Sequence, residues 1–543
     1  WLSFYTFPGT RNTLFACLLT GDGEPAMSVL SRFAGPVGIG AIAAVAFATS
    51  ASADQMQLPS DVKMTCPVSE GTIQSWLQEP PSSPLPSWRA PSGAVFDPPS
   101  SVTFQADNDY NTDNCDFYKW GQQMFLWLTS PDSSDGAGRV LTGPSIYNVL
   151  PAEGGKRTLQ PHGSGNELLN LALRDDKTDD EIGEVGQAGG GGVLMSQDNS
   201  LVYYGVHVND LYAAFLTGYK NDDLDSPKVF PRTDADLNTV TNYASSHGID
   251  VTEPETLAME LKTSWVRADT LDNKEDYFRI FGYVPNFVES TGTDVPRLMQ
   301  FNDNTDKQPV ELALVGMHVV GTVEHHPEFV WASFEHVDNA PNAPYYYTTS
   351  AGETKRTVDP QGNYLFTDSS TDPSDHGSAN VECMHVQDGH IVPIMKDGQP
   401  VCEGGIVPSS TVRVNPWGAE AGDQAQPAVD NNTLLISNNI SVQGWLASDD
   451  PRRNYVQIGG LWTAPAQNRG VDAPIPKIGG FGSDAPSYSE SDQRGSRQLA
   501  NATMETYNQE INCFICHSVS TDAPNSFGAF SLSHIFSEID PLN

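Results

Sequence analysis

Three residues near the end of the chain have the types and the spacing of a cofactor attachment site. Cys513, Cys516 and His517 form the pattern C-x-x-C-H within the stretch NCFICH. In this pattern the two thiols add across the vinyl groups of a haem, and the histidine that follows ligates the iron. The sequence therefore predicts one covalently bound haem c, attached through Cys513 and Cys516, with His517 as the proximal ligand of the haem iron.

The motif does not decide the ligand on the other face of the haem. Only 26 residues follow His517 and none of them is methionine, which excludes the downstream methionine ligand of small cytochromes c. His534 lies 17 residues after His517, and we favour it as the distal ligand because Pro524 and Gly528 let the chain turn between them. The alternatives are an open or water-filled position, Met504, or one of four body histidines, His318, His325, His326 and His336.

The body histidines also raise the question of a second metal. Residues 316–336 contain imidazole and carboxylate groups of the types that bind zinc, copper or non-haem iron, namely His318, His325, His326, Glu335 and His336. The alternative is a turn before Pro327 flanked by strand histidines that make ordinary hydrogen bonds.

A partial calcium-loop pattern occurs in residues 107–113. Asp107, Asp109, Asn111 and Asp113 alternate as in the first half of such a loop. Thr112 stands where the loop needs glycine, however, and no glutamate closes it. Calcium binding is therefore left open.

Covalent haem attachment requires export from the bacterial cytoplasm, and residues 27–53 have the order of a secretory signal peptide. Met27 and Arg32 precede an apolar run over residues 33–48, and the small residues Ala51, Ser52 and Ala53 follow it. Cleavage after Ala53 predicts a periplasmic or secreted bacterial protein, with membrane attachment only if this segment is retained. Residues 1–26 precede the first methionine and are interpreted as an upstream segment outside the native protein.

The remaining cysteines suit an oxidising compartment. Setting aside Cys17 and the haem pair leaves Cys66, Cys115, Cys383 and Cys402. Four cysteines allow three pairings, and the alternative is four free structural thiols. We favour Cys66 with Cys115 and Cys383 with Cys402, because each pair is close in the sequence.

The charge of the chain limits its partners. The formal net charge is −39 at pH 7, so nucleic acid and anionic membrane surfaces would repel the protein. A basic redox partner protein would suit this charge. The sequence does not indicate an oligomeric state.

The elements that must hold the haem segment belong to an α+β, β-rich chain. Residues 54–104 are rich in proline and serine and predict an N-terminal arm lying over the body. Residues 105–490 predict a body built on an antiparallel sheet or sandwich with peripheral helices, and residues 491–543 a C-terminal helix plus the haem segment. Helices are predicted over 115–130, 234–247 and 496–510, and a further helix after the strand at 201–208; other strands are predicted over 261–268, 277–284, 310–323 and 328–337.

Several stretches together resemble a group of exported bacterial proteins of the cytochrome c family, also described as cytochrome c domain-containing. They are CDFYKWGQQMFLWLTS, ELKTSWV, LVGMHVVG, FVWASFEHVDNAP and the terminal NCFICH. The resemblance covers most of the chain from about residue 115, and it implies haem and export without implying a substrate. The stretch FEHVDNAP is expected either to line the haem pocket or to form a strand followed by a capped turn.

Three functions remain open. The first is a monohaem c-type cytochrome that takes part in electron transfer through a redox partner. The second is a haem-dependent oxidoreductase, similar to a peroxidase or oxygenase, with an open distal site. The third is a secreted binding protein whose haem is structural or sensing. The sequence contains no P-loop, no dinucleotide fingerprint and no G-x-S-x-G nucleophile turn.

Overall fold

The structure is a computed structural model that describes most of residues 55–463 and shorter pieces on either side. The described residues are 17–19, 25–27, 55–78, 86–91, 114–131, 139–152, 155–161, 169–170, 194–227, 229–284, 287–289, 299–301, 309–323, 326–360, 362–368, 384–387, 390–393, 395–400, 408–420, 422–463, 493–506, 509, 513, 517, 530, 532–533 and 535–542.

The chain divides into two compact units, residues 1–52 and residues 53–543. In the first unit the structure describes strands β1 (Cys17–Leu19) and β2 (Pro25–Met27), which pair antiparallel. The N-terminal arm, the body and the C-terminal part that the sequence predicts all belong to the second unit.

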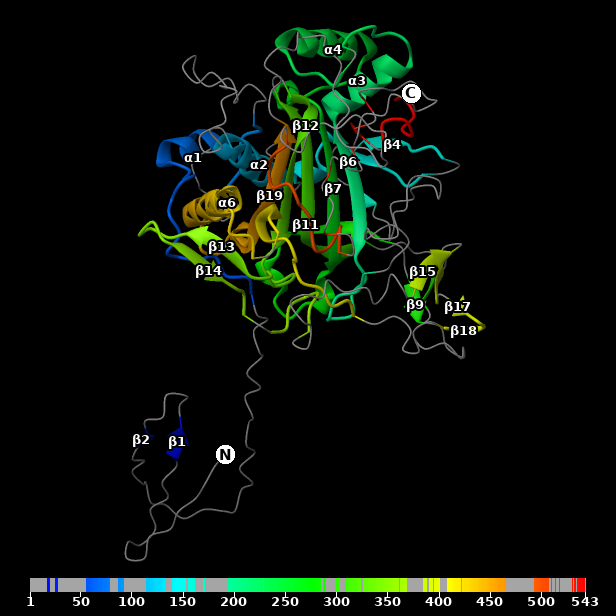
Figure 1. Ribbon diagram of the computed structural model, residues 1–543. Coiled ribbons are helices and arrows are strands. Elements are labelled where there is room, and N and C mark those ends of the chain that lie inside the picture. The colour runs from blue at the N-terminus through cyan, green and yellow to red at the C-terminus, as the bar shows by residue number, and fades with distance from the viewer. Residues whose placement is uncertain are drawn as a thin grey trace, which may run out of the picture. The chain divides into compact units, whose positions relative to one another are not determined.

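A mostly antiparallel sheet, with ten strands among the described residues, is the centre of the second unit (Figure 1). In spatial order its main path is β20 (Gln493–Gly495), β19 (Tyr455–Thr463), β12 (His326–His336), β11 (Val310–Val323), β7 (Met259–Arg267), β6 (Tyr203–Asn209), β3 (Ile146–Val149) and β4 (Leu159–Pro161). β8 (Arg279–Tyr283) also pairs with β11, and β5 (Leu169–Asn170) pairs with β8 as a parallel neighbour. The fold is α+β with a sheet-rich body, as the sequence predicts.

The long strands form where β-branched and aromatic residues alternate with smaller or polar ones. β11 has the predicted bounds of 310–323, and β6, β7, β8 and β12 overlap the ranges predicted for them. β19 was not predicted. In its middle Gly459 and Gly460 interrupt the run of large residues, and their lack of a side chain lets Leu499 and Tyr118 approach the strand from opposite sides.

The strand register defines two faces of the sheet. The helix face carries His207 of β6, Leu261 and Thr263 of β7, Met317 and Val319 of β11, and Ala332 and Phe334 of β12. The segment face carries Val206 and Val208 of β6, Glu260, Lys262 and Ser264 of β7, Gly316, His318 and Val320 of β11, and Trp331, Ser333 and Glu335 of β12.

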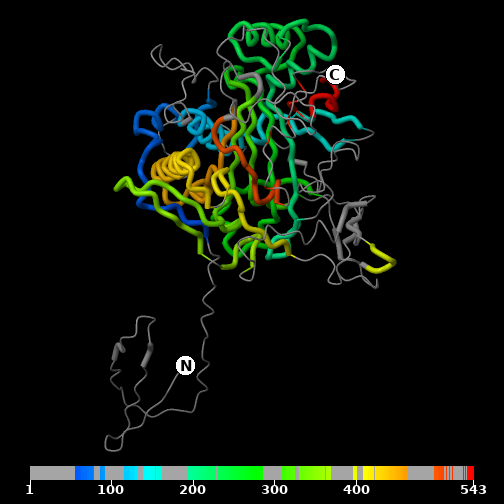
Figure 2. The backbone as a smooth tube through the Cα atoms, viewed as in Figure 1, coloured from blue at the N-terminus to red at the C-terminus, as the bar shows by residue number. Residues whose placement is uncertain are grey.

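Helices α2 (Asn114–Leu128) and α6 (Gln426–Trp445) pack beside β19 and cover the helix face (Figures 1 and 2). The Phe125 ring of α2 stacks on Phe334, with 4.6 Å between the ring centroids. Trp120 lies over Gly321, where an added Cβ would come within 3.0 Å of the indole. The aromatic stripe of the predicted helix over 115–130 is therefore part of the core, as the sequence indicates.

Helix α6 was not predicted because its sequence is rich in asparagine and serine, which favour turns and helix ends over helix interiors. Its polar side chains are buried and hydrogen-bonded instead. Asn439 Nδ2 donates to the Gln457 carbonyl at 2.9 Å, and Asn431 Nδ2 donates to the Trp417 carbonyl at 2.9 Å. Tertiary contacts on several sides thus stabilise a helix that local propensity does not favour.

Helices α3 (Asp210–Lys220) and α4 (Asp234–His247) pack together at one end of the sheet (Figure 1). Thr233 and Asp236 form a reciprocal capping box at the start of α4, and Gly248 ends the helix at φ +72°. These bounds match the predicted helix over 234–247. α3 follows β6, as predicted.

The described residues of the predicted N-terminal arm contact the body and contain the short helix α1 (Glu70–Trp76). The amide of Met56 donates to Val337 and that of Lys63 to Thr348, both at 2.9 Å. A disulfide joins Cys66 to Cys115 at the start of α2, which confirms one of the two predicted pairs. Cys383 and Cys402 lie outside the described residues.

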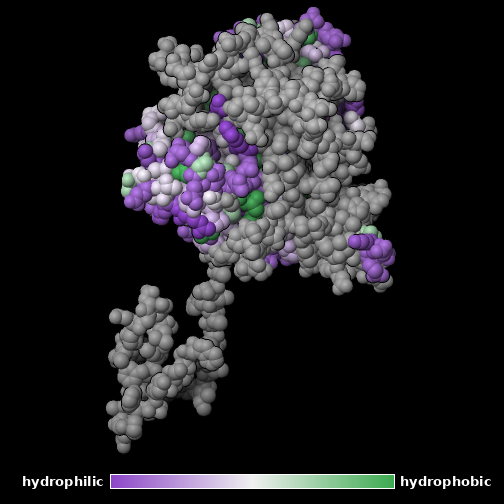
Figure 3. Space-filling view, viewed as in Figure 1, coloured by the Kyte–Doolittle hydropathy of each residue, from purple (hydrophilic) through white to green (hydrophobic). Residues whose placement is uncertain are grey.

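Smaller elements surround this core. Three further sheets contain β9 (Phe287–Glu289), β10 (Met299–Phe301), β15 (Met384–Gln387) and β16 (His390–Pro393); β13 (Tyr345–Thr348) and β14 (Thr354–Thr357); and β17 (Met395–Lys396) and β18 (Gln399–Pro400). The short 3-10 helices are Val140–Thr142, Pro254–Thr256, Ala268–Thr270, Lys274–Asp276, Pro416–Gly418 and Pro451–Asn454. The coloured surface of Figure 3, in the region of α1, α6, β13 and β14, is mostly hydrophilic.

The described residues from 496 to 542, called the C-terminal segment below, pack largely on the segment face. The helix predicted over 496–510 is wrong for residues 496–506, which form turns and extended backbone. Asn501 ties this stretch to the sheet: its side chain accepts from Thr503 N at 2.9 Å and donates to Ser333 and Phe334. The Glu505 amide donates to the Asn501 carbonyl at 2.8 Å, so only one helical turn forms among residues 496–506.

Candidate functional site

Two of the three motif residues are described, and the backbone brings them together in one turn. The amide of His517 donates to the carbonyl of Cys513 at 2.8 Å, which is the i to i+4 hydrogen bond of a helical turn. Cys513 is half-buried and packs against the main hydrophobic core. Cys516 lies outside the described residues, so its side chain is not placed.

The imidazole of His517 is oriented by a backbone carbonyl. Its Nδ1 lies 2.8 Å from the carbonyl oxygen of Leu532. A carbonyl oxygen only accepts, so Nδ1 carries the proton and the lone pair is on Nε2. This is the tautomer that an iron-ligating histidine requires, with a second group holding the ring from behind. The ring lies 4.3 Å from that of Trp331 on the segment face.

Leu532 is itself held in place by neighbours in the C-terminal segment. The hydroxyl of Ser533 donates to Glu260 Oε2 at 2.6 Å and lies 2.8 Å from the Tyr212 hydroxyl of α3. Phe530 and Phe536 are buried and stack on each other with centroids 4.6 Å apart. The chain that orients His517 is therefore fixed to the sheet, to α3 and to the aromatic core.

His534, the favoured distal ligand, lies outside the described residues, and the prediction stays a prediction. Two described residues near it in the sequence, Leu532 and Ile535, are relevant to this prediction. The carbonyl of Leu532 is on the Nδ1 side of His517, whereas an iron on Nε2 would be on the opposite side of the ring. Ile535 is buried in the core.

His318 has a carboxylate partner. Its Nε2 lies 3.0 Å from Glu505 Oε1 and 3.1 Å from Oε2, and both side chains are half-buried. Burial raises the pKa of Glu505, but the charge and hydrogen bond of His318 and the charge of Lys262 outweigh it, so the pKa is below its usual value. His318 is therefore held by contacts with the Glu505 carboxylate on the segment face.

His336 is at a different place and has a different role. It is fully buried, stacks on Tyr277 with centroids 3.7 Å apart, and its Nδ1 accepts from the Asp338 amide at 3.2 Å. Its Nε2 donates to the carbonyl of Asp276 at 3.1 Å. Burial lowers the pKa of His336, only partly offset by Asp338, and this is the chemistry of a neutral core histidine.

The second metal site predicted as a possibility in residues 316–336 does not form among the residues described. There, no group of three or more His, Cys, Asp or Glu side chains could hold an ion. Glu335 is buried against Arg413. His325 lies outside the described residues, and the side chain of His326 is not placed. The candidate calcium residues 107–113 also lie outside.

The structure also shows the surroundings of Met504 and the conformation of the stretch FEHVDNAP. Met504 is fully buried in a second hydrophobic cluster with Tyr204 and Val315, whereas Cys513 packs against the main cluster. FEHVDNAP ends β12 and continues into a turn, in which the Asn339 amide donates to the His336 carbonyl at 3.1 Å. This favours the second of the two interpretations of that stretch.

Sequence reasoning missed Trp331 and Leu532, the partners of His517, and Glu505, the partner of His318. Leu532 acts through its carbonyl oxygen, which every residue has, and so no sequence signal could have identified it. Glu505 was assigned to a helix that does not form. Trp331 lies in FVWASFEHVDNAP, one of the stretches that resemble the cytochrome c family. That resemblance was the only sequence feature that pointed to Trp331.

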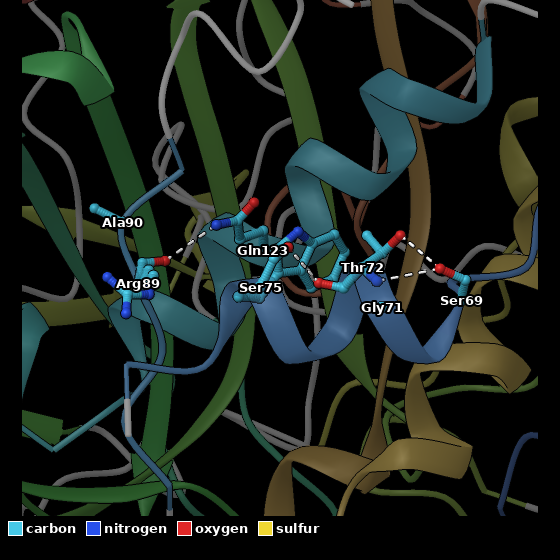
Figure 4. Close-up of a pocket in the computed structure, with 8 residues that line it drawn as sticks. Ser69, Gly71, Thr72, Ser75, Arg89, Ala90 and Gln123 are labelled. Carbon is cyan, nitrogen blue, oxygen red and sulfur yellow. Dashed lines mark hydrogen bonds between the residues drawn. The ribbon is translucent and has the colours of Figure 1, made fainter. Parts of the chain in front are cut away.

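A surface pocket lies apart from the motif, between α1 and α2 (Figure 4). It is lined by Ser69, Gly71, Thr72, Ser75, Trp76, Arg89, Ala90 and Gln123. Its polar groups mainly serve the local structure, since Ser69 caps α1 and Gln123 Nε2 donates to the Arg89 carbonyl. The arrangement contains no acid, base or nucleophile set for catalysis.

No helix in the part of the chain that the structure describes is both long enough and apolar enough to cross a membrane. The predicted signal segment is not among those residues.

Comparison with known proteins adds no relative: no protein-family model, no curated protein and no solved structure matches this chain. The chemistry of the site is therefore argued from its own residues.

Proposed function

We propose that this chain is an exported monohaem c-type cytochrome that takes part in electron transfer, periplasmic or secreted, with one haem c held by Cys513, Cys516 and His517. The observation that carries the proposal is the orientation of His517. Its backbone is tied to Cys513 in a helical turn, and its Nδ1 is tied to Leu532, so that Nε2 has the lone pair for iron.

The residues around the motif suit this cofactor. When bound, haem supplies a one-electron iron couple whose potential is set by ligands, hydrogen bonds and burial. Cys513 would attach the ring, His517 would ligate the iron, and Trp331 packs beside the imidazole. Phe530 and Phe536 are buried on either side of Leu532 in the sequence. The charge of −39 supports a basic redox partner.

Haem staining tests the cofactor. Protein made in a strain competent for cytochrome maturation should give a haem-stained band on a denaturing gel, and Cys513→Ala with Cys516→Ala should lose it. The matched control is Cys66→Ala with Cys115→Ala, which removes a cysteine pair of the disulfide and should keep the stain. A colourless wild-type band would overturn the proposal.

A second function, a haem-dependent oxidoreductase with an open distal site, is favoured by the position of Leu532. The carbonyl of Leu532, two residues before His534, lies on the Nδ1 side of His517, away from the Nε2 atom that would ligate the iron. The spectrum of the reduced protein with carbon monoxide separates the two functions. An electron carrier with His534 as distal ligand should not bind CO until His534→Ala is introduced, whereas ready binding by the wild type supports the oxidoreductase.

A further inference from the structure

The surface pocket between α1 and α2 has lining groups that the proposed function does not use (Figure 4). Its volume is about 590 Å³, and small-molecule sites commonly measure about 300–1,000 Å³. It contains no set of groups for catalysis, but a binding site needs only complementary shape, charge and hydrogen bonding. The pocket is therefore considered as a ligand site.

The pieces of chain that line the pocket are fixed to one another. The disulfide between Cys66 and Cys115 joins the chain just before α1 to the start of α2. The amide of Arg89 donates to the Trp76 carbonyl at 2.6 Å, and Gln123 Nε2 donates to the Arg89 carbonyl at 3.3 Å. The walls are thus held in place before a ligand binds, which lowers the entropy cost of binding.

The charge at the pocket is opposite to that of the chain as a whole. The formal net charge of the protein is −39, yet the lining residues include Arg89 and no aspartate or glutamate. Arg89 Nε donates to the Leu77 carbonyl at 2.9 Å, and no described carboxylate pairs with the two terminal nitrogens of the guanidinium. Such a planar fork binds a carboxylate through two parallel hydrogen bonds. An ammonium group would find no anion to pair with here.

The other polar groups of the pocket include two acceptors. Ser75 Oγ donates its one proton to the Thr72 carbonyl at 2.7 Å, so toward a ligand it only accepts. A carbonyl oxygen only accepts, so the Gln123 atom that faces the Arg89 carbonyl is the nitrogen. Gln123 Oε1 then remains as an acceptor that no described residue uses. One cation and two acceptors match a ligand that carries one carboxylate and several hydroxyl groups.

We propose that this pocket binds a small hydroxylated carboxylate of the sugar-acid class. The carboxylate pairs with Arg89, and hydroxyl groups of the ligand donate to Ser75 and Gln123. The carbon skeleton lies against Trp76 and Ala90, the apolar residues of the lining. This inference goes beyond the proposed function and does not depend on the haem, and it involves no covalent step.

Isothermal titration calorimetry of the purified protein with D-glucuronate tests the site. Saturable binding in the millimolar range or tighter is expected, because this ligand matches the guanidinium and both acceptors. Glucose lacks the carboxylate and acetate lacks the hydroxyl groups. Each should bind at least about tenfold more weakly, since the loss of hydrogen bonds of these kinds costs about that factor or more.

A variant of the cation locates the site in this pocket. Arg89→Gln should weaken the binding of glucuronate at least about tenfold and leave the weak binding of glucose unchanged. The matched control is Lys63→Gln, which removes an exposed positive charge from the same N-terminal arm, outside the pocket lining, and should bind glucuronate as the wild type does. If Arg89→Gln does not fold, the neutral amide of glucuronate is titrated into the wild type instead. It should bind at least about tenfold more weakly than glucuronate.

The outcomes are distinct. The absence of saturable glucuronate binding overturns the site. Equal affinities of the wild type and Arg89→Gln, or of glucuronate and its amide, overturn the pairing of the carboxylate with Arg89. Acetate binding as tight as that of glucuronate overturns the role of the two acceptors. An equal loss in Lys63→Gln contradicts the proposal, because the effect would then come from the net charge of the protein and not from the pocket.

Discussion

The two faces of the central sheet are covered by different chemistry. On the helix face, α2 and α6 bury aromatic and aliphatic side chains, as where Phe125 stacks on Phe334. On the segment face, the C-terminal segment meets charged and hydroxyl groups, including Glu260, His318 and Glu335. The helix face thus meets stacked aromatic side chains of α2, whereas the contacts of the segment face include specific charged and hydroxyl pairs.

This difference separates two kinds of stabilisation within one sheet. An apolar face tolerates no unpaired charge, and its free energy changes with packed volume. A polar face stays stable only if each buried group has a partner, and the C-terminal segment supplies partners for Glu260, His318 and Glu335. The segment face can therefore hold buried polar groups without loosening the core.

The largest effect is expected on the helix face. Phe334→Ala removes a buried ring and its stacking on Phe125, and should lower the free energy of unfolding by about 3–5 kcal/mol. Urea unfolding followed by tryptophan fluorescence measures the loss. Phe281→Ala is the control, because 55% of Phe281 is exposed and its loss should cost about 0.5 kcal/mol or less. Equal losses for the two variants would contradict this account of the helix face.

The disulfide between Cys66 and Cys115 ties the arm to the layer that covers the helix face. Its cysteines are 49 residues apart, for which loop-closure entropy gives about 4 kcal/mol at most, and replaced disulfides commonly show 2–4 kcal/mol. Cys66→Ala with Cys115→Ala should therefore unfold at lower urea. Peptide mapping without reduction checks the bond and also decides whether Cys383 pairs with Cys402. A free thiol at Cys66 in the native protein would contradict the assignment.

The segment face should respond to charge rather than to volume. Glu335→Gln leaves Arg413 buried without its carboxylate, at an expected cost of about 3 kcal/mol. Adding Arg413→Met should recover part of that loss, since both charges are then gone. Glu311→Gln is the control, because its pairs with Lys274 and Arg279 are partly exposed and should contribute about 1 kcal/mol or less. No recovery in the double variant would mean that packing, not charge, controls this face.

The same contrast explains what the sequence could and could not predict. Local periodicity predicted the helix α2 and the strand β11. The fixed spacing of a motif was enough to select Cys513 and His517 as candidate site residues. The turn at Asn501 and the pair of His318 with Glu505 join residues more than 150 positions apart, as does the contact of Trp331 with His517. Such contacts depend on strand register and on the path of the C-terminal segment, which local patterns do not contain.

The smallest effect concerns the pH dependence of the core. His336 is buried on the helix-face side, and its pKa is lowered by burial, so the unfolded chain binds a proton more readily than the folded one. As the pH falls below about 6.5, the usual value for histidine, this residue should lower stability by at most about 1.4 kcal/mol per pH unit. Asp210 and Asp359 have the opposite effect on stability. Burial raises the pKa of each to about 6, so the folded state binds a proton more readily than the unfolded chain and gains stability as the pH falls.

Because these contributions oppose one another, the pH dependence of the wild-type stability does not isolate His336. The test is therefore the difference in the free energy of unfolding between the wild type and a His336 variant. The free energy of unfolding of the wild type and of His336→Gln is measured from pH 8 to about pH 5, where histidines titrate. The wild type should lose stability relative to the variant as the pH falls. His247→Gln, at an exposed position, should give no such divergence. Parallel curves for the wild type and His336→Gln would show that His336 does not stay neutral in the folded protein, and the helix face would then contain a charge that its packing does not accommodate.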